Sequence, residues 1–143
     1  MANGNNSQKQ WKLATQALHA GRPDGMENPS HGVPVSRTAA YRFRDTQHAA
    51  DLFNLTESGY IYSRLHNPTQ DVLEQRITAL EGGAASLALA SGTSAIFYAI
   101  INIAGAGSEI IASNNLYGGT FTMFNNILPD YGIQVRFFDP MNP

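Results

Sequence analysis

The sequence predicts an α/β fold in which helices flank a parallel sheet, preceded by an extended N-terminal arm. In residues 85–138, short apolar runs alternate with apolar helical stretches, a pattern typical of parallel strands joined by right-handed crossovers. Residues 22–44 contain Pro23, Pro29 and Pro34 and lack apolar periodicity, which favours an extended arm over regular structure. Of the 143 residues, 43% are hydrophobic and 14% are charged, a balance that suits a packed interior.

Three helices are predicted in the first half of the chain, after a polar tail over residues 1–10. Asp45 and Asn67 are good N-caps for the second and third helices, and Pro68 suits a first helical turn. A glycine is expected to end each helix. The predicted ranges are 11–19, 46–58 and 68–81, followed by Gly21, Gly59 and Gly82.

The second half of the chain is predicted to contain three strands with two helices between them. The strands are expected over 85–90, 109–112 and 133–138, and the helices over 94–104 and 120–128, the latter stopped by Pro129. The Met and Phe residues of 121–124 are expected in the core. Ligands of open α/β sheets bind beyond the carboxyl ends of the strands, so the loops after the first two strands are the informative ones.

The tripeptide Ser91-Gly92-Thr93 joins the first predicted strand to the start of a helix. A first helical turn has unpaired N–H groups at the positive end of the helix dipole, and Gly92 lets the backbone approach a ligand closely. These features favour a cradle for a phosphate group. A tight turn with a Ser or Thr cap and no ligand explains the same residues, and both interpretations stay open at this point.

Two further positions extend the phosphate hypothesis. Tyr117 precedes two glycines at the end of the second strand, where an aromatic ring can stack on a planar cofactor. Tyr62 and Arg64 lie two residues apart and point the same way in an extended segment, and a guanidinium beside a phenol suits a phosphate. A Tyr117 packed in the core, and a solvated Arg64 beside a packed Tyr62, are the structural alternatives.

Composition disfavours several other functions. The formal net charge is −2 and the basic residues form no run, so we expect neither nucleic acid nor a membrane as a partner. The chain has no cysteine, which excludes disulfides and thiolate chemistry. No metal site is predicted, because the histidines show neither metal-ligand spacing nor nearby carboxylates. They are His19, His31, His48 and His66.

Three motifs in register resemble the Cys/Met-metabolism family of pyridoxal-phosphate (PLP) enzymes, which have fold type I. Residues 59–69 (GYIYSRLHNPT) resemble the family's YSRxxNPT signature, and residues 90–95 (ASGTSA) resemble its ASGMAA phosphate loop. Residues 116–120 match its LYGGT loop. The LHAG of residues 18–21 resembles the opening of the O-acetylhomoserine sulfhydrylases within this family. The resemblance covers nearly all of residues 11–143.

The resemblance implies a role for each motif. The phosphate loop would donate the backbone N–H groups of Gly92 and Thr93 to the PLP phosphate, and Tyr117 would stack on the pyridine ring. The YSRxxNPT segment would reach the phosphate of a neighbouring subunit, so that active sites lie at dimer interfaces. The implied cofactor-binding residues are Ser91, Gly92, Thr93, Tyr117, Tyr62 and Arg64.

The implied reaction is γ-replacement on O-acetylhomoserine with sulfide or a thiol, which gives homocysteine or methionine plus acetate. Gly119 stands where methionine γ-lyases carry cysteine, which disfavours the lyase. Cystathionine γ-synthase and methionine γ-lyase are the alternatives within the family, and a non-catalytic phosphate-binding fragment is the alternative of another class. The family's Schiff-base lysine lies beyond the third strand, so Lys9 and Lys12, the only lysines, do not fill its role. This chain alone is therefore expected to be inactive.

We therefore expect the N-terminal part of a cytoplasmic enzyme of methionine biosynthesis that assembles as a homotetramer. Its partners would be a small-molecule substrate, the C-terminal remainder of the same subunit and further copies of that subunit. Residues 1–65 would form a tail, arm and helix that pack on a neighbouring subunit. Residues 66–143 would form the incomplete start of the PLP-binding domain.

Overall fold

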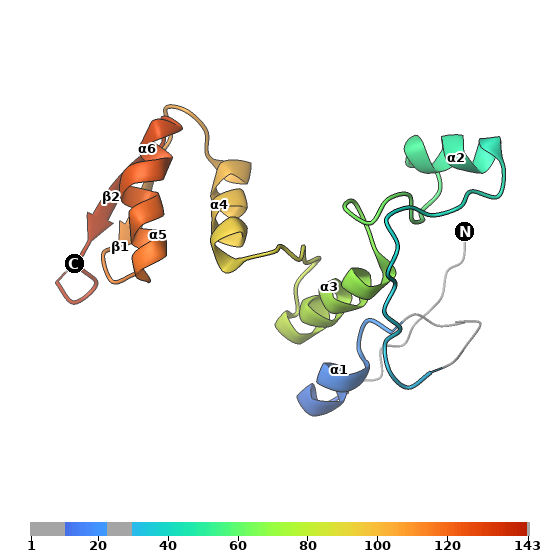
Figure 1. Ribbon diagram of the computed structural model, residues 1–143. Helices are drawn as coiled ribbons and strands as arrows, with labels where there is room; N and C mark the ends of the chain where they lie inside the picture. Colours follow the sequence, from blue (N-terminus) through green and yellow to red (C-terminus); the bar gives the residue numbers. More distant parts are fainter. Residues whose placement is uncertain (1–10, 23–29, 143) are drawn as a thin grey trace. The chain divides into compact units, whose positions relative to one another are not determined.

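The computed structural model describes residues 11–22 and 30–142, and the expectations for the tail at 1–10 and for Pro23 and Pro29 lie outside this part. The chain divides into two compact units, Met1–Ala88 and Leu89–Pro143 (Figure 1). None of the helices among the described residues is both long and apolar enough to cross a membrane. The first unit contains α1 (Leu13–His19), α2 (Thr46–Phe53) and α3 (Pro68–Glu81). The second contains α4 (Gly92–Ile103), β1 (Glu109–Ser113), α5 (Gly118–Thr122), the π-helical turn η1 (Met123–Ile127), α6 (Leu128–Asp130) and β2 (Gln134–Phe138).

The predicted starts of α2 and α3 are confirmed by their caps. The Asp45 carboxylate accepts a hydrogen bond from the backbone N–H of His48 at 2.8 Å. The Asn67 side-chain oxygen accepts one from the N–H of Thr69 at 2.9 Å. The predicted end of α3 is also confirmed, because Gly82 has the left-handed φ of 63° that glycine adopts at little cost.

The predicted end of α2 is wrong, since the helix stops at Phe53 rather than before Gly59. Leu55 has a φ of 59°, and a left-handed residue cannot continue a right-handed helix. The N–H of Thr56 then turns back to donate to the carbonyl of Asp51 at 2.9 Å. A closed turn therefore occupies residues that the prediction assigned to the helix.

The extended arm over residues 30–44 is bonded to the segment that leads into α3. Ala40 and Tyr62 form an antiparallel bridge, and the N–H of Ser63 donates to the carbonyl of Ala39 at 2.9 Å. The arm therefore has backbone partners within its own unit, although most of its side chains are exposed.

Helix α1 docks on α3 through the turn that follows it. Gly21 has a φ of 73°, and a Cβ there would lie 2.6 Å from the carbonyl oxygen of Val72. The Arg76 Nε donates to the carbonyl of Ala20 at 2.9 Å. Close approach of the two backbones thus explains why this position of the LHAG motif is glycine.

The second unit contains a parallel pair of strands, as the sequence predicts for its second and third strands. In β1 and β2, Glu109 lies opposite Gln134 and Ser113 opposite Phe138. The predicted strand at 85–90 is wrong, because these residues form no ladder. A strand needs a neighbour for its backbone groups, and here the N–H of Ala88 donates to a Glu74 carboxylate oxygen at 2.8 Å instead.

One continuous helical stretch replaces the predicted helix at 120–128. It begins at Gly118, passes through the π turn η1, and ends after Asp130. Pro129 was expected to stop the helix but lies within its last turn. The wider π turn ends at Ile127, two residues before Pro129, and the chain turns away from the helix after Asp130, with Gly132 at a φ of 77°.

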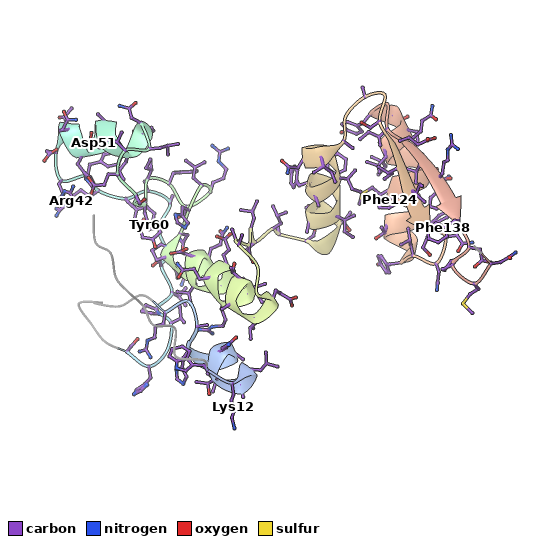
Figure 2. All side chains as sticks on the ribbon, turned by 180° about the vertical axis from the view of Figure 1, so that it is seen from behind. Lys12, Arg42, Asp51, Tyr60, Phe124 and Phe138 are labelled. Atoms are coloured by element: carbon purple, nitrogen blue, oxygen red, sulfur yellow. The ribbon has the colours of Figure 1, made fainter. Side chains whose placement is uncertain are left out.

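The core of the second unit lies between this helical stretch and the two strands. Leu128 is fully buried and Ile133 is 1% exposed. Met123 and Phe124 are buried as predicted, and Phe124 is labelled in Figure 2, whereas Phe121 is 37% exposed, so its predicted place in the core is wrong. Burial of such side chains stabilises a fold by about 1.5–3 kcal/mol each. This core fixes the ends of α4 and β1, where the predicted ligand loops lie.

Candidate functional site

The N-terminal corner of α4 is open and carries unpaired backbone donors. Ser91 is the N-cap, and its Oγ accepts from the N–H of Ser94 at 3.1 Å. The N–H of Ala95 donates to the Ser91 carbonyl at 3.0 Å. The N–H groups of Gly92 and Thr93 stand at the first two helical positions, where helix geometry supplies no acceptor. A Cβ on Gly92 would meet no atom within 4 Å.

This geometry refines the prediction for the corner. The helix begins at Gly92, two residues before the predicted start at Ser94. Ser91 serves as the cap that the structural alternative required, and its capping leaves Gly92 and Thr93 free to donate to a ligand. A capped helix and a phosphate cradle are therefore compatible in the same tripeptide, because they use different donors.

Tyr117 directly precedes α5, which is in contact with α4. Its residue surface is 80% exposed, so Tyr117 is not part of the apolar core of this unit. A Cβ on Gly119 would lie 3.0 Å from the Tyr117 Cε1, so the ring rests against the bare α-carbon of that glycine. The exposed ring is available for stacking on a planar group.

Tyr62 and Arg64 lie together in the first unit, but the predicted extended segment is wrong, because the N–H of Leu65 donates to the Tyr62 carbonyl at 2.9 Å and closes a turn. The guanidinium carbon of Arg64 is 5.5 Å from the centroid of the Tyr62 ring, within the range of a cation–π contact. Tyr62 is 42% exposed, so its phenol is accessible beside the charge. The two units thus each carry one part of the predicted cofactor-binding set.

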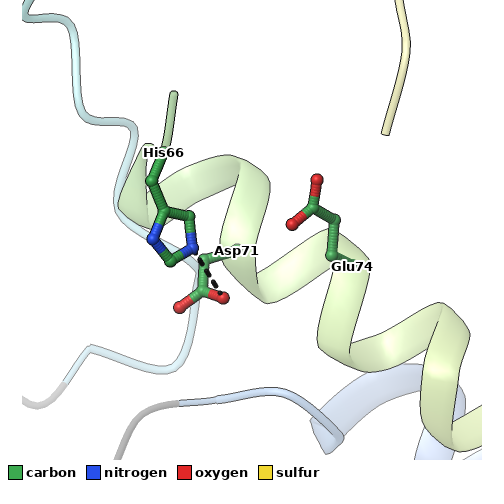
Figure 3. Close-up of side chains that lie close together, drawn as sticks. All are labelled: His66, Asp71 and Glu74. Carbon is green, nitrogen blue, oxygen red and sulfur yellow. Dashed lines mark ion pairs between the residues drawn. The ribbon is translucent and has the colours of Figure 1, made fainter. Parts of the chain in front are cut away.

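A polar network on α3 was missed by the sequence analysis. The Asp71 carboxylate accepts from the Tyr60 hydroxyl at 3.1 Å and lies 3.2 Å from the His66 Nε2. Figure 3 shows the His66 ring beside Asp71, with Glu74 one turn further along the helix. The expectation that no histidine has a carboxylate nearby is therefore wrong. Tyr60 and His66 lie on an irregular loop and Asp71 on a helix, at separations of six and five residues, so no periodic signal reveals this contact.

Electrostatics couple the three groups of this network. Partial burial acts to raise the pKa of Asp71, but hydrogen bonds from Gln75, His66 and Tyr60 outweigh it and hold that pKa below its ordinary value. Burial and the neighbouring Asp71 carboxylate raise the pKa of Tyr60 to about 12. Asp71 is therefore ionised and Tyr60 is a neutral donor across the physiological range.

Two residues of this network, His66 and Asp71, also form a group of potential metal ligands with Glu74. Ligand atoms of His66, Asp71 and Glu74 lie within 4.8 Å of one another, a grouping found among the described residues. Glu74 Oε1 already accepts from the Gln70 side chain and the Ala88 N–H, each at 2.8 Å. A metal ion would displace these bonds and the Asp71 contacts, so we assign the group to a hydrogen-bond network. The predicted absence of a metal site stays a prediction.

Comparison with known sequences places this geometry in context. The family described as Cys/Met metabolism PLP-dependent enzyme matches residues 14–143. An O-acetyl-L-homoserine sulfhydrylase of Leptospira meyeri is 49% identical over 140 residues, which are 98% of this chain and 32% of the relative. A homocysteine synthase of Schizosaccharomyces pombe is 48% identical over 129 residues, or 90% of this chain and 30% of the relative. The chain thus spans about a third of the length of these relatives.

Solved structures share the fold. A crystal structure described as a putative O-acetylhomoserine (thiol)-lyase from Campylobacter jejuni, containing N'-pyridoxyl-lysine-5'-monophosphate, has a TM-score of 0.84 at 45% identity. It is matched over 90% of this chain and 32% of its own. Cystathionine γ-lyase from Lactobacillus plantarum, complexed with L-serine, has a TM-score of 0.77 at 31% identity over 90% of this chain and 31% of its own. These likenesses confirm the predicted α/β architecture.

Proposed function

Because this chain belongs to the Cys/Met-metabolism family of PLP-dependent enzymes, we propose that it forms the N-terminal part of an O-acetylhomoserine sulfhydrylase. The complete enzyme would replace the acetate of O-acetylhomoserine with sulfide or a thiol, giving homocysteine or methionine. This proposal is supported by a difference in sequence identity. The Campylobacter jejuni structure, described as a putative O-acetylhomoserine (thiol)-lyase, is 45% identical to this chain, whereas the Lactobacillus plantarum cystathionine γ-lyase is 31% identical. The Leptospira relative, named for the same chemistry, is 49% identical.

The structural observation that carries the proposal is the open corner of α4. Gly92 and Thr93 would donate their N–H groups to the PLP phosphate, and the helix dipole would favour its negative charge. The space that a Cβ on Gly92 would enter is empty of protein atoms, as a cradle for a phosphate requires. Thr93 stands where the family's loop has methionine, and a backbone donor tolerates that change.

Tyr117 would orient the cofactor ring. Its exposed ring lies at the residue before α5, and α5 contacts the helix whose first turn would hold the phosphate. When bound, PLP supplies an electron-withdrawing ring that activates the α-carbon of an amino acid. The contribution of this chain would be to hold that ring by stacking and to anchor it through the phosphate.

Tyr62 and Arg64 would bind the phosphate of a second copy of the enzyme. Arg64 offers paired N–H donors and Tyr62 one O–H, which together suit phosphate oxygens. On this proposal residues 1–65 pack on a neighbouring subunit, residues 66–143 begin the PLP-binding domain, and the enzyme is a cytoplasmic homotetramer. The only lysines are Lys9 and Lys12, so the lysine that the reaction needs would come from the remainder of the subunit.

A matched pair of glycine substitutions in the full-length enzyme tests the phosphate corner. Both Gly92 and Gly105 have open space where a Cβ would stand, and both lie in the second unit. We expect Gly92→Ala to weaken PLP binding by roughly tenfold or more, since crowding of about 1–3 kcal/mol corresponds to that range. Gly105→Ala should bind PLP as the wild type does. The readout is visible absorbance during titration of the apoenzyme with PLP.

Two kinds of measurement test cofactor binding at the corner of α4 and the reaction separately. Equal PLP affinity in Gly92→Ala and the wild type would remove the corner of α4 from the cofactor site. The reaction itself is tested by acetate release from O-acetylhomoserine, with and without sulfide. A full-length enzyme that binds PLP but releases no acetate under these conditions would contradict the assignment as a sulfhydrylase.

A further inference from the structure

One carboxylate holds both ends of the turn that carries Tyr62 and Arg64. Asp71 lies in the first turn of α3 and accepts from the Tyr60 hydroxyl at 3.1 Å. Its other oxygen lies 3.2 Å from the Nε2 of His66. Because Tyr60 precedes the turn and His66 follows it, Asp71 closes the segment against the helix.

The contacts around this carboxylate are packed as well as polar. The rings of Tyr60 and His66 lie with their centroids 5.0 Å apart, and the Tyr41 ring is 5.3 Å from that of Tyr60 on the arm side. Glu74 is the further charged group within 4.8 Å of the His66 and Asp71 ligand atoms. Tyr60, His66 and Asp71 therefore contact one another through both ring packing and polar interactions.

The backbone of the turn is held by the arm at its start, where Tyr62 bridges Ala40 and the N–H of Ser63 donates to the Ala39 carbonyl at 2.9 Å, and by bonds within the turn beyond that point. The N–H groups of Leu65 and His66 donate to the carbonyl of Tyr62 at 2.9 and 3.1 Å. Leu65 is 66% exposed, so apolar packing contributes little to its shape. Because the arm fixes Tyr62 and Ser63, the placement of the Arg64 guanidinium over the Tyr62 ring depends on the later part of the turn and on the His66 contact with Asp71 that follows it.

We propose that Asp71 is a positioning residue for the cofactor site, which acts through Tyr60 and His66 to hold Tyr62 and Arg64 in phosphate-binding geometry. This inference rests on the proposed function, since it concerns the same PLP phosphate. Preorganised donors bind more tightly because less ordering remains to be done on binding. The lowered pKa of Asp71 agrees with this role, because the carboxylate stays charged where the enzyme would work.

The test uses four variants of the full-length holoenzyme: Asp71→Ala, Asp71→Asn, Arg64→Ala and the double variant Asp71→Ala/Arg64→Ala. Glu81→Gln is the matched control, because Glu81 is an exposed acid at the end of the same helix. PLP affinity is measured by titration of the apoenzyme. We expect Asp71→Ala to weaken PLP binding about tenfold, a part of what the charged hydrogen bonds of Arg64 to the phosphate would contribute. Asp71→Asn, which keeps an acceptor for Tyr60, should lose less.

The double variant distinguishes positioning from a general structural defect. If Asp71 positions Arg64 and Tyr62, Asp71→Ala should weaken PLP binding less in the Arg64→Ala background than in the wild type, because one of the two groups it positions is already gone. Losses that simply multiply would overturn the positioning role, as would wild-type affinity in Asp71→Ala beside weakened Arg64→Ala. That second result leaves the proposed function intact. Wild-type affinity in Arg64→Ala would instead remove the turn from the phosphate site, and a full-length protein that binds no PLP would overturn the proposed function itself.

Discussion

The two units of this chain build their candidate binding groups in opposite ways. In the second unit the phosphate corner consists of backbone N–H groups at Gly92 and Thr93, and an apolar core holds the helix and strands around it. In the first unit the candidate groups are the side chains of Tyr62 and Arg64, on a turn held by polar contacts. A backbone site tolerates side-chain changes that leave its N–H groups and the space in front of them open, whereas a side-chain site depends on each residue and on what positions it.

The difference extends to what stabilises each unit. The buried apolar residues of the second unit form one cluster around Leu128 and Ile133. Among the described residues of the first unit, the buried apolar side chains are Ala20, Leu52 and Val72, on separate elements. Its elements are linked instead by bonds such as Arg76 to the Ala20 carbonyl. We therefore expect core substitutions to act mainly on the second unit and substitutions of polar groups mainly on the first.

The largest expected effect is that of Leu128→Ala on stability. Leu128 is fully buried in the second unit, and truncation of a buried leucine to alanine costs about 2–5 kcal/mol because a cavity remains. Thermal unfolding of the full-length apoenzyme should show a lower midpoint. Leu128→Met conserves volume and should cost less than about 1.5 kcal/mol. Equal midpoints for Leu128→Ala and Leu128→Met would show that the core does not dominate this unit.

The next largest expected effect is on PLP affinity, and it compares a side-chain donor, Arg64, with a backbone donor, Thr93. Arg64→Ala removes a charged donor from the turn and should weaken PLP binding by roughly tenfold to a hundredfold, the value of about 1.5–3 kcal/mol for such bonds. Thr93→Ala keeps the backbone N–H and should change PLP affinity less than about threefold, within the cost of an ordinary exposed substitution. PLP titration of each apoenzyme measures both. A larger loss for Thr93→Ala than for Arg64→Ala would reverse the comparison.

Sequence reasoning succeeded where periodicity and capping decide the structure. The caps Asp45 and Asn67 and the left-handed Gly82 follow from local backbone chemistry, so they were predicted correctly. The strands β1 and β2 pair with each other within the second unit, and their apolar runs were recognised. The α/β fold-type I assignment rested on motifs in register and is confirmed by solved structures.

Prediction from the sequence failed where a partner distant in the sequence determines the local structure. Residues 85–90 look like a strand, but strand formation needs a neighbour, and the Ala88 N–H bonds to Glu74 instead. The end of α2 depends on the left-handed backbone of Leu55, and leucine rarely adopts that conformation, so the sequence does not predict it. Pro129 failed as a stop because a π turn precedes it. The Asp71 network joins a loop to a helix through side chains without periodic spacing, so only the folded chain reveals it.

The smallest expected effect is a shift in the titration of Tyr60, which directly tests the polar contacts of the first unit. Burial and the Asp71 carboxylate raise the pKa of Tyr60 from 10.0 to about 12. A pKa raised on folding means that the neutral phenol contributes stability below pH 10, and that this contribution is lost as the pH rises towards about 12. The difference in near-ultraviolet absorbance between the wild type and Tyr60→Phe isolates this one phenol from the other tyrosines. Asp71→Asn removes the adjacent negative charge, so in that background the same difference should titrate at lower pH. If Tyr60 titrates at its ordinary pKa with Asp71 present, the carboxylate does not hold the phenol. The first unit would then not depend on polar contacts in the way that the second depends on its apolar core.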